Sequence, residues 1–177
     1  MSSIVEFLEK CVGKWFSQRT GHNLSDRKSV LGKGDLWMEA LAADAPEAIA
    51  LCQTYGVDPQ SIAAGLKMRW EAITASPKKE LGSSVLVALT PDAAGAGALL
   101  ATPTAQQNSQ PGRYSFGSDG ALWLTLPIAG GSIEERIWFA SDNLRFRSST
   151  TTRSNGPNFA SFCSEIRMGV TPPKAAD

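Results

Sequence analysis

The chain has 177 residues, 42% of them hydrophobic, and its 17 lysines and arginines balance 17 aspartates and glutamates. This length fits one domain with a substantial core, and the neutral charge argues against a nucleic-acid-binding protein. We also expect no membrane span and no secretion signal, because no apolar run is long enough and the N-terminus lacks a charged segment before an apolar one.

The cysteines and histidine exclude two further classes. Cys11, Cys52 and Cys163 are odd in number and far apart in the chain, which favours reduced thiols in a cytoplasmic protein over a disulfide framework. They also lack the spacing of metal ligands, and His22 is the only histidine. We therefore expect no zinc site.

The opening segment is predicted to form a short helix. Ser3 and Glu6 have the spacing of a capping box, and Gly13 is a typical helix stop. The apolar residues that recur on one helical face are Ile4, Phe7, Leu8 and Cys11. A short helix followed by Gly-x-Trp is similar to the start of a lipocalin-type barrel. In that comparison Trp15 closes the barrel floor and has a structural role.

Two strand-like stretches come next. The first runs from Lys14 to His22 and the second from Lys28 to Ala42. Gly32-Lys33-Gly34 interrupts the second stretch, which predicts a bulge or a hairpin turn there.

Between Asp44 and Gly65 the apolar period changes from that of a strand to that of a helix. Asp44 and Pro46 favour a helix start, and Gly56 favours a stop. The apolar stripe of this helix is Ala48, Leu51, Cys52 and Tyr55. One helical insertion in an otherwise β chain is expected to cover the open end or the side of a barrel.

After Gly65 the pattern is that of strands and turns. The predicted strands are Lys67–Thr74, Ser84–Thr90, Ala98–Ala101, Arg113–Phe116, Leu122–Ile128, Glu134–Ala140, Leu144–Arg153 and Phe159–Val170. About ten strands predict a mainly β fold, either a closed antiparallel barrel or a sandwich. The short connections favour an up-and-down barrel with room for one small ligand. We expect one domain over residues 1–171 and a disordered tail over 172–177.

The hairpin from Glu134 to Arg147 carries an unusual set of side chains. Strict alternation puts Glu134, Arg136 and Trp138 on one face of its first strand, and Arg145 and Arg147 on one face of the second. If the turn Ser141-Asp142-Asn143 brings these faces together, arginines, an acid and an indole form one wall. Such a wall is either a solvated sheet surface or the lining of a site for an anionic, conjugated ligand.

Common catalytic patterns are missing from this sequence. The single histidine lies near no nucleophile motif, and no glycine-rich loop joins a strand to a helix. Taken singly, each of these residues also fits a surface or core role: Arg19, His22, Trp70, Trp138, Arg145 and Arg147. Their combination inside a barrel favours a ligand that carries carboxylates and an extended π system.

Several motifs in order resemble one family. They are residues 13–22 (Gly-Lys-Trp-Phe-Ser-Gln-Arg-Thr-Gly-His), 134–141 (Glu-Glu-Arg-Ile-Trp-Phe-Ala-Ser), 143–145 (Asn-Leu-Arg) and 160–167 (Ala-Ser-Phe-Cys-Ser-Glu-Ile-Arg). They look like those of the S/U-type phycobiliprotein lyases, the CpcS/CpeS/CpcU family, and the likeness extends from the first helix to about Val170. The resemblance implies a lipocalin-like closed barrel. It also implies a lyase that joins an open-chain tetrapyrrole, phycocyanobilin or phycoerythrobilin, to a phycobiliprotein cysteine through a thioether.

The resemblance also implies roles for particular residues. Arg19, Arg145 and Arg147 would clamp the propionates, Trp70 and Trp138 would stack on pyrrole rings, and Glu134 or His22 would protonate and orient the bilin. Arg19 and His22 are three residues apart, so both reach the cavity only if the strand bulges at Gly21.

The resemblance further implies partners and leaves alternatives open. The acceptor would be an apo-phycobiliprotein α or β subunit near phycobilisomes in a cyanobacterial cytosol. The bilin would be bound as substrate with no separate cofactor, by a homodimer or by a heterodimer with a related lyase. The alternatives are a bilin carrier, a non-catalytic partner subunit of a heterodimeric lyase, and a barrel for a fatty acid or other apolar ligand.

Overall fold

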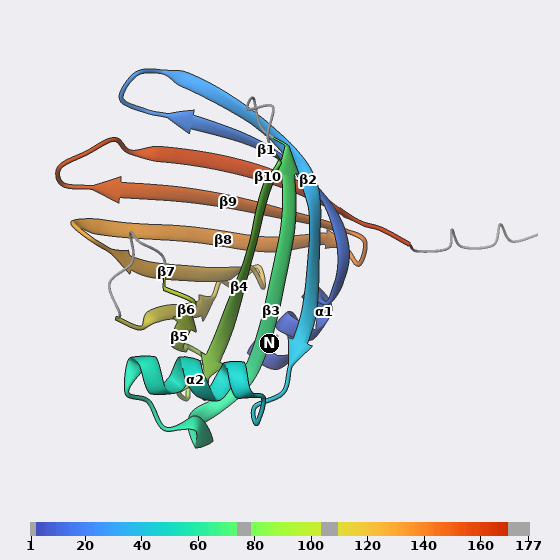
Figure 1. Ribbon diagram of the computed structural model, residues 1–177, viewed down its shortest axis with the longest axis vertical. Coiled ribbons are helices and arrows are strands. Elements are labelled where there is room, and N and C mark those ends of the chain that lie inside the picture. Colours follow the sequence, from blue (N-terminus) through green and yellow to red (C-terminus); the bar gives the residue numbers. More distant parts are fainter. Residues whose placement is uncertain (1–2, 74–78, 104–109, 170–177) are drawn as a thin grey trace, which may run out of the picture.

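Ten antiparallel strands close into a barrel in the computed structural model, which describes residues 3–73, 79–103 and 110–169 (Figure 1). The strands are β1 (Gly13–Asn23), β2 (Lys28–Leu41), β3 (Ile62–Ile73), β4 (Glu80–Leu89), β5 (Gly97–Ala101), β6 (Gly112–Phe116), β7 (Leu122–Ile128), β8 (Gly131–Ser141), β9 (Leu144–Arg153) and β10 (Phe159–Arg167). Neighbours in the barrel follow the chain order, and β1 closes the ring by pairing with β10. The predicted up-and-down barrel is therefore confirmed, and the predicted tail over 172–177 lies outside the described residues.

Strand register decides which side chains enter the barrel. Directly paired residues share a face of the sheet, and successive residues alternate between the faces. Trp15 is fully buried and pairs with Leu36, which pairs in turn with Trp70, so all three face inward. The same alternation along β1 turns Arg19 inward and His22 outward.

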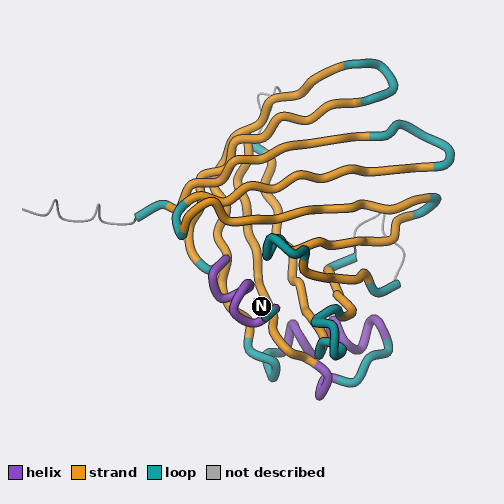
Figure 2. The backbone as a smooth tube through the Cα atoms, turned by 180° about the vertical axis from the view of Figure 1, so that it is seen from behind, coloured by secondary structure: helices purple, strands orange, loops and turns teal. Residues whose placement is uncertain are grey.

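Helix α1 (Ile4–Cys11) closes one end of the barrel (Figures 1 and 2). Both hydrogen bonds of its capping box are present: the Glu6 amide donates to the Ser3 hydroxyl, and the Ser3 amide donates to the Glu6 carboxylate. The predicted apolar face of Ile4, Phe7, Leu8 and Cys11 is buried. Because that face packs into the strands, the helix acts as a plug for this end.

Trp15 forms the centre of this closed floor, as predicted. Its indole N–H donates to the Cys11 carbonyl oxygen at 2.8 Å, which satisfies the one polar atom of a fully buried ring. Phe139 lies edge-on to Phe7 with ring centroids 5.3 Å apart, and it packs against Trp15 at 6.1 Å. These aromatic contacts join α1, β1 and β8 into one core.

Helix α2 (Pro46–Tyr55) covers the side of the barrel rather than its open end. Pro46 occupies the first turn, and Gly56 adopts the left-handed conformation that ends the helix. The buried residues Ala48, Leu51 and Cys52 pack against Val87 and Leu100 on the outer faces of β4 and β5. A short 3₁₀ turn, η1 (Pro59–Ser61), leads from this helix into β3.

The break predicted at Gly32-Lys33-Gly34 is absent. Strand β2 pairs without interruption with β1 and with β3 through these residues. Gly34 has another role, because a Cβ there would lie 2.1 Å from the carbonyl oxygen of Glu71. The glycine therefore permits a close approach of β2 to β3 in a strongly curved wall.

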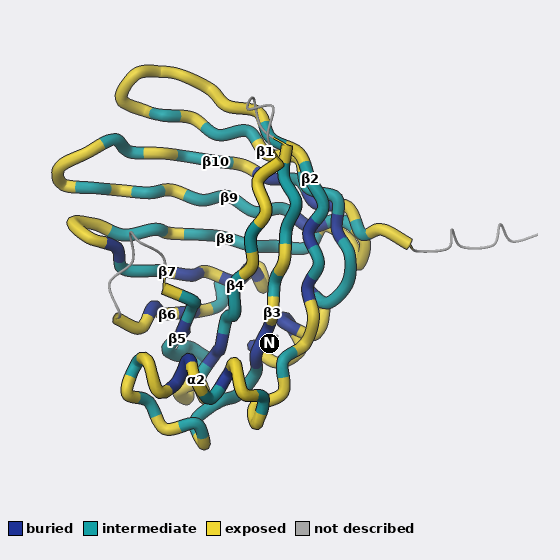
Figure 3. The backbone as a smooth tube through the Cα atoms, viewed as in Figure 1, coloured by how far each residue is buried: buried dark blue, intermediate teal, exposed yellow. Residues whose placement is uncertain are grey.

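Buried segments gather towards α1 and α2, whereas the tips of the β1–β2 and β9–β10 hairpins are exposed (Figure 3). The barrel is thus packed at one end and less filled towards those tips. Within the described residues, no helix combines the length and apolar character needed to span a membrane.

Candidate functional site

A cavity of about 400 Å³ lies inside the barrel above the packed floor, against β1, β2, β3, β4 and β9. Inward-facing residues of its lining include Ser17, Arg19, Met68, Trp70, Ser84 and Arg147. Two guanidinium groups, hydroxyls and one indole share this space with the inward-facing carboxylate of Glu80, and the lining also includes Lys33, Asp35 and Glu71. Such a lining suits a flat ligand that carries negative charge, because guanidinium groups pair with carboxylates and indoles stack on conjugated rings.

A buried carboxylate supports the arginine side of the cavity. Glu165 on β10 is 0% exposed, and its Oε2 accepts a hydrogen bond from Arg145 Nε at 2.6 Å. Its other oxygen, Oε1, lies 3.4 Å from both Arg147 Nη2 and the Ser17 hydroxyl. Burial raises the pKa of Glu165, but the attraction of Arg147 and then Arg145 outweighs burial and lowers that pKa overall. Glu165 is therefore an anion at neutral pH.

The two arginines of this cluster occupy different depths. Arg145 is 2% exposed, and its guanidinium lies 4.8 Å from the Trp15 ring and 3.3 Å from the Met38 sulfur, within the floor. Arg147 lies two residues further along β9, nearer the cavity. Its side chain is 33% exposed and forms part of the cavity lining. Arg147 can thus meet a ligand, whereas Arg145 is covered by the floor.

Arg19 is the second cation of the cavity wall. It is exposed, and it takes part in no ion pair with the residues that the structure describes. Cys163 faces inward between Arg19 and Arg147, because β10 pairs with β1 on one side and with β9 on the other. A free cation and a paired cation therefore flank one buried thiol on the inner wall.

Trp70 lies flat against the wall because its partner has no side chain. Trp70 pairs with Gly82 on β4, and a Cβ on Gly82 would come within 2.2 Å of the indole. The glycine leaves room for the indole to cover the backbone of β4. This contact holds the ring in the cavity lining.

His22, predicted as a site residue, faces the outside of the barrel. The bulge at Gly21 that would turn it inward is absent, since β1 pairs in unbroken register with both neighbours through this residue. The His22 ring is exposed, and its Nδ1 lies 2.9 Å from the Ser29 hydroxyl. Arg19 and His22 therefore do not share a cavity.

The prediction that arginines, an acid and an indole form one wall on the β8–β9 hairpin is also wrong. A bulge at Ala140 makes Phe139 the partner of Arg145 and Trp138 the partner of Phe146. One extra residue reverses the alternation of the whole strand relative to its partner. Glu134 and Trp138 consequently lie on the outer face, while Arg145 and Arg147 face inward.

Sequence reasoning missed the carboxylates that face these arginines. Glu165 occurs in the motif over 160–167 without a predicted role, and Glu135 alternates with Glu134, so it falls on the face opposite the predicted wall. Burial lowers the pKa of Arg147, yet the attraction of Glu165 and then Glu135 raises it overall, so both carboxylates lie near this guanidinium. Each could have been found from strand pairing, because Glu135 pairs with Ser149 and Glu165 with Arg145.

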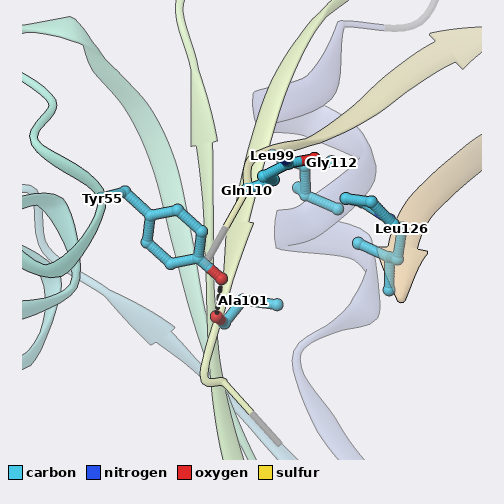
Figure 4. A pocket seen from close by; sticks show the side chains of 7 residues that line it. Tyr55, Leu99, Ala101, Gln110, Gly112 and Leu126 are labelled. Carbon is cyan, nitrogen blue, oxygen red and sulfur yellow. Dashed lines mark hydrogen bonds between the residues drawn. The ribbon is translucent and has the colours of Figure 1, made fainter. Parts of the chain in front are cut away.

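A second hollow lies between α2 and the barrel and is too small for a ligand. Tyr55, Leu99, Gly112 and Leu126 contribute to its lining, and the Tyr55 hydroxyl donates to the Ala101 carbonyl at 2.7 Å (Figure 4). Its volume of about 10 Å³ has room for a single water molecule. The hydrogen bond from Tyr55 to Ala101 anchors α2 to β5.

Within the described part of the chain, no group of three or more histidine, cysteine, aspartate or glutamate side chains could hold a metal ion. Cys11, Cys52 and Cys163 are all free and buried.

Known proteins resemble this chain over nearly its whole length. The family model described as "CpeS-like protein" matches residues 3–168. A chromophore lyase CpcS/CpeS of Thermosynechococcus vestitus is 42% identical over 96% of this chain and 95% of its own length. A phycocyanobilin lyase subunit CpcS of a Picosynechococcus species is 32% identical over 94% of this chain and 87% of its own. Among solved structures, the S-type phycobiliprotein lyase CpeS of Guillardia theta superposes with a TM-score of 0.86 at 30% identity and covers 96% of this chain and 95% of its own.

Proposed function

This chain belongs to the CpeS-like family, and from that premise we propose that it is a phycobilin lyase. It binds an open-chain tetrapyrrole inside the barrel and joins it through a thioether to a cysteine of an apo-phycobiliprotein subunit. The observation that carries this proposal is the presence of Arg19, Arg147 and Trp70 in one cavity of about 400 Å³. An apolar ligand such as a fatty acid needs at most one cation, so two arginines beside an indole favour the bilin.

The residues of the cavity divide the work of binding. Arg19 and Arg147 pair with the two propionates of the bilin, and Trp70 stacks on one of its pyrrole rings. Glu134 and His22 face outward, so the acid of the site is one of two inward-facing carboxylates, Glu80 in the cavity lining or Glu135 beside Arg147. Arg145 forms an ion pair with Glu165, and Glu165 forms a second ion pair with Arg147. Arg145 therefore affects the ligand indirectly, by positioning Glu165 and Arg147.

Attachment is an addition, and no group leaves. The acceptor cysteine, as thiolate, forms a carbon–sulfur bond to the ethylidene group of the bilin, and a proton is taken up by the conjugated system. The nucleophile belongs to the acceptor, so the three buried cysteines of this chain need not react. The lyase contributes proximity and orientation, which hold the electrophilic carbon towards one thiol and suppress side reactions.

Partners, location and cofactor follow from the same proposal. The chain acts in the cytosol, consistent with its three free cysteines, and needs no cofactor besides the bilin substrate. It works as a homodimer or with a related lyase subunit. Relatives are named for phycocyanobilin and for phycoerythrobilin, so both bilins belong in the test.

A mixing experiment tests the lyase activity. Purified chain, free bilin and apo-subunit are combined, the proteins are denatured, and covalent chromophore is measured on the subunit. We expect covalent colour that requires the chain. Bound colour without covalent transfer contradicts the lyase and supports the second candidate, a carrier or non-catalytic partner, which the word "subunit" in the name of the Picosynechococcus relative favours.

A further inference from the structure

A groove of about 700 Å³ runs along the outer face of β10, β1 and β2. Its outward-facing residues include Gln18, Thr20, Leu31, Lys33, Ile73 and Phe162. They are neighbours in the sheet, since Thr20 pairs with Phe162 on one side and with Leu31 on the other. Most of the groove therefore belongs to the outer wall, while Arg19, Val30 and Gly32 of its lining lie on the inward face of the same strands.

Much of this groove is apolar surface in contact with solvent. Leu31 is 70% exposed, and Ile73 and Phe162 are exposed as well. Phe162 stacks on Phe146 with ring centroids 5.6 Å apart, and Trp138 packs beside both rings. A cluster of exposed apolar side chains held rigidly in a concave surface is typical of a protein-binding site.

The charge of the groove has one sign. Its ionisable lining residues are Arg19 and Lys33, and no carboxylate lines it. Within the described residues, neither cation takes part in an ion pair. The surface is thus complementary to a partner that presents apolar and acidic side chains together.

The groove and the ligand cavity share a wall. Arg19, Gly32 and Lys33 line both of them. Because these residues line both spaces, a protein bound in the groove lies next to a ligand bound in the cavity. That position suits the molecule that receives the ligand.

We propose that this groove docks the acceptor, through an acidic amphipathic segment of the apo-phycobiliprotein subunit. The inference rests on the lyase function proposed above and adds the surface at which the acceptor binds. A second copy of this chain is a poorer occupant. A symmetric contact between two identical grooves would bring the unpaired cations of both copies together.

The test compares two leucines of nearly equal exposure on the outer wall. Leu31→Asp alters the groove, whereas Leu81→Asp changes a residue 72% exposed on β4, outside the groove. Lys33→Glu reverses the charge of the groove without removing apolar surface. Each variant is assayed for bilin binding by absorbance titration, for the KM of the apo-subunit in covalent transfer, and for its oligomeric state by light scattering.

We expect Leu31→Asp and Lys33→Glu to raise the KM for the apo-subunit at least about ten-fold, as loss of a central contact does. Leu81→Asp should leave the KM within about two-fold, and Leu31→Asp and Leu81→Asp should bind free bilin within about two-fold of the wild type. Equal KM values for Leu31→Asp and Leu81→Asp overturn the docking site. So does a change of oligomeric state at unchanged KM, which assigns the groove to a second copy. Failure of the lyase function itself is distinct, because the wild type would then transfer no bilin.

Discussion

Arg145 donates to Glu165 at 2.6 Å in a part of the barrel where the two residues are 2% and 0% exposed. Loss of either partner of such a buried pair destabilises the fold, because the charge that remains is desolvated and has no counter-ion. Here the carboxylate also reaches Arg147, so the pair connects the aromatic floor with the ligand cavity.

Replacement of Glu165 by glutamine should destabilise the chain strongly. The amide keeps the size of the carboxylate but leaves Arg145 as a buried, uncompensated cation, which costs about 3–5 kcal/mol of unfolding free energy. Chemical denaturation followed by tryptophan fluorescence measures this loss. Glu134→Gln is the matched control, because Glu134 is exposed on the outer face and its replacement should change stability by less than about 0.5 kcal/mol. Equal stability of the two variants would contradict a structural role for Glu165.

The same carboxylate predicts a loss of stability in acid. The pKa of Glu165 in the folded chain is lowered from its ordinary value of 4.5, since the two arginines outweigh burial. A lowered pKa means that the unfolded chain binds the proton more readily, so the stabilisation is present above pH 4.5 and is lost as the pH falls through the folded pKa. Unfolding free energies between pH 7 and pH 3 should decline more steeply in the wild type than in Glu165→Gln. Parallel slopes would show that Glu165 does not titrate in this range.

Single substitutions in the cavity should separate inner from outer residues. Arg19→Ala and Arg147→Ala each remove a charged contact to a propionate and should weaken bilin binding about 10- to 100-fold. Absorbance titration with free bilin measures the dissociation constants. His22→Ala and Trp138→Ala change residues of the outer face and should bind within about two-fold of the wild type. Weakened binding in those two variants alone would place the bilin outside the barrel.

Gly82 offers a test of the position of Trp70. A Cβ at residue 82 would lie 2.2 Å from the indole, so Gly82→Ala should force the ring away from the wall and weaken bilin binding about ten-fold. A shift in tryptophan fluorescence should accompany the change. Gly21→Ala is the control in another strand, because a Cβ there meets only the Val30 carbonyl oxygen at an ordinary 3.7 Å. An unchanged spectrum and affinity in Gly82→Ala would show that the ring does not need this space.

Local patterns were sufficient for the elements of this fold. The capping box of Ser3 and Glu6 predicted α1, and Pro46 and Gly56 predicted the limits of α2. Period-two alternation, short turns and the number of strands predicted the closed barrel. These signals depend on neighbours in sequence, so one chain is enough to read them.

Only the tertiary structure shows which face of each strand points into the barrel. Alternation shows that Trp138 and Glu134 share a face, but the hydrogen-bond register across the hairpin decides whether that face meets the arginines. The bulge at Ala140 puts Glu134 and Trp138 on the face opposite the arginines, and the unbroken register at Gly21 leaves His22 on the outer face. Glu165 meets Arg145 only because β9 and β10 pair, so this contact joins residues twenty positions apart. The sequence by itself determined the strands and the chemistry they carry, whereas strand pairing decided which of those side chains face the cavity.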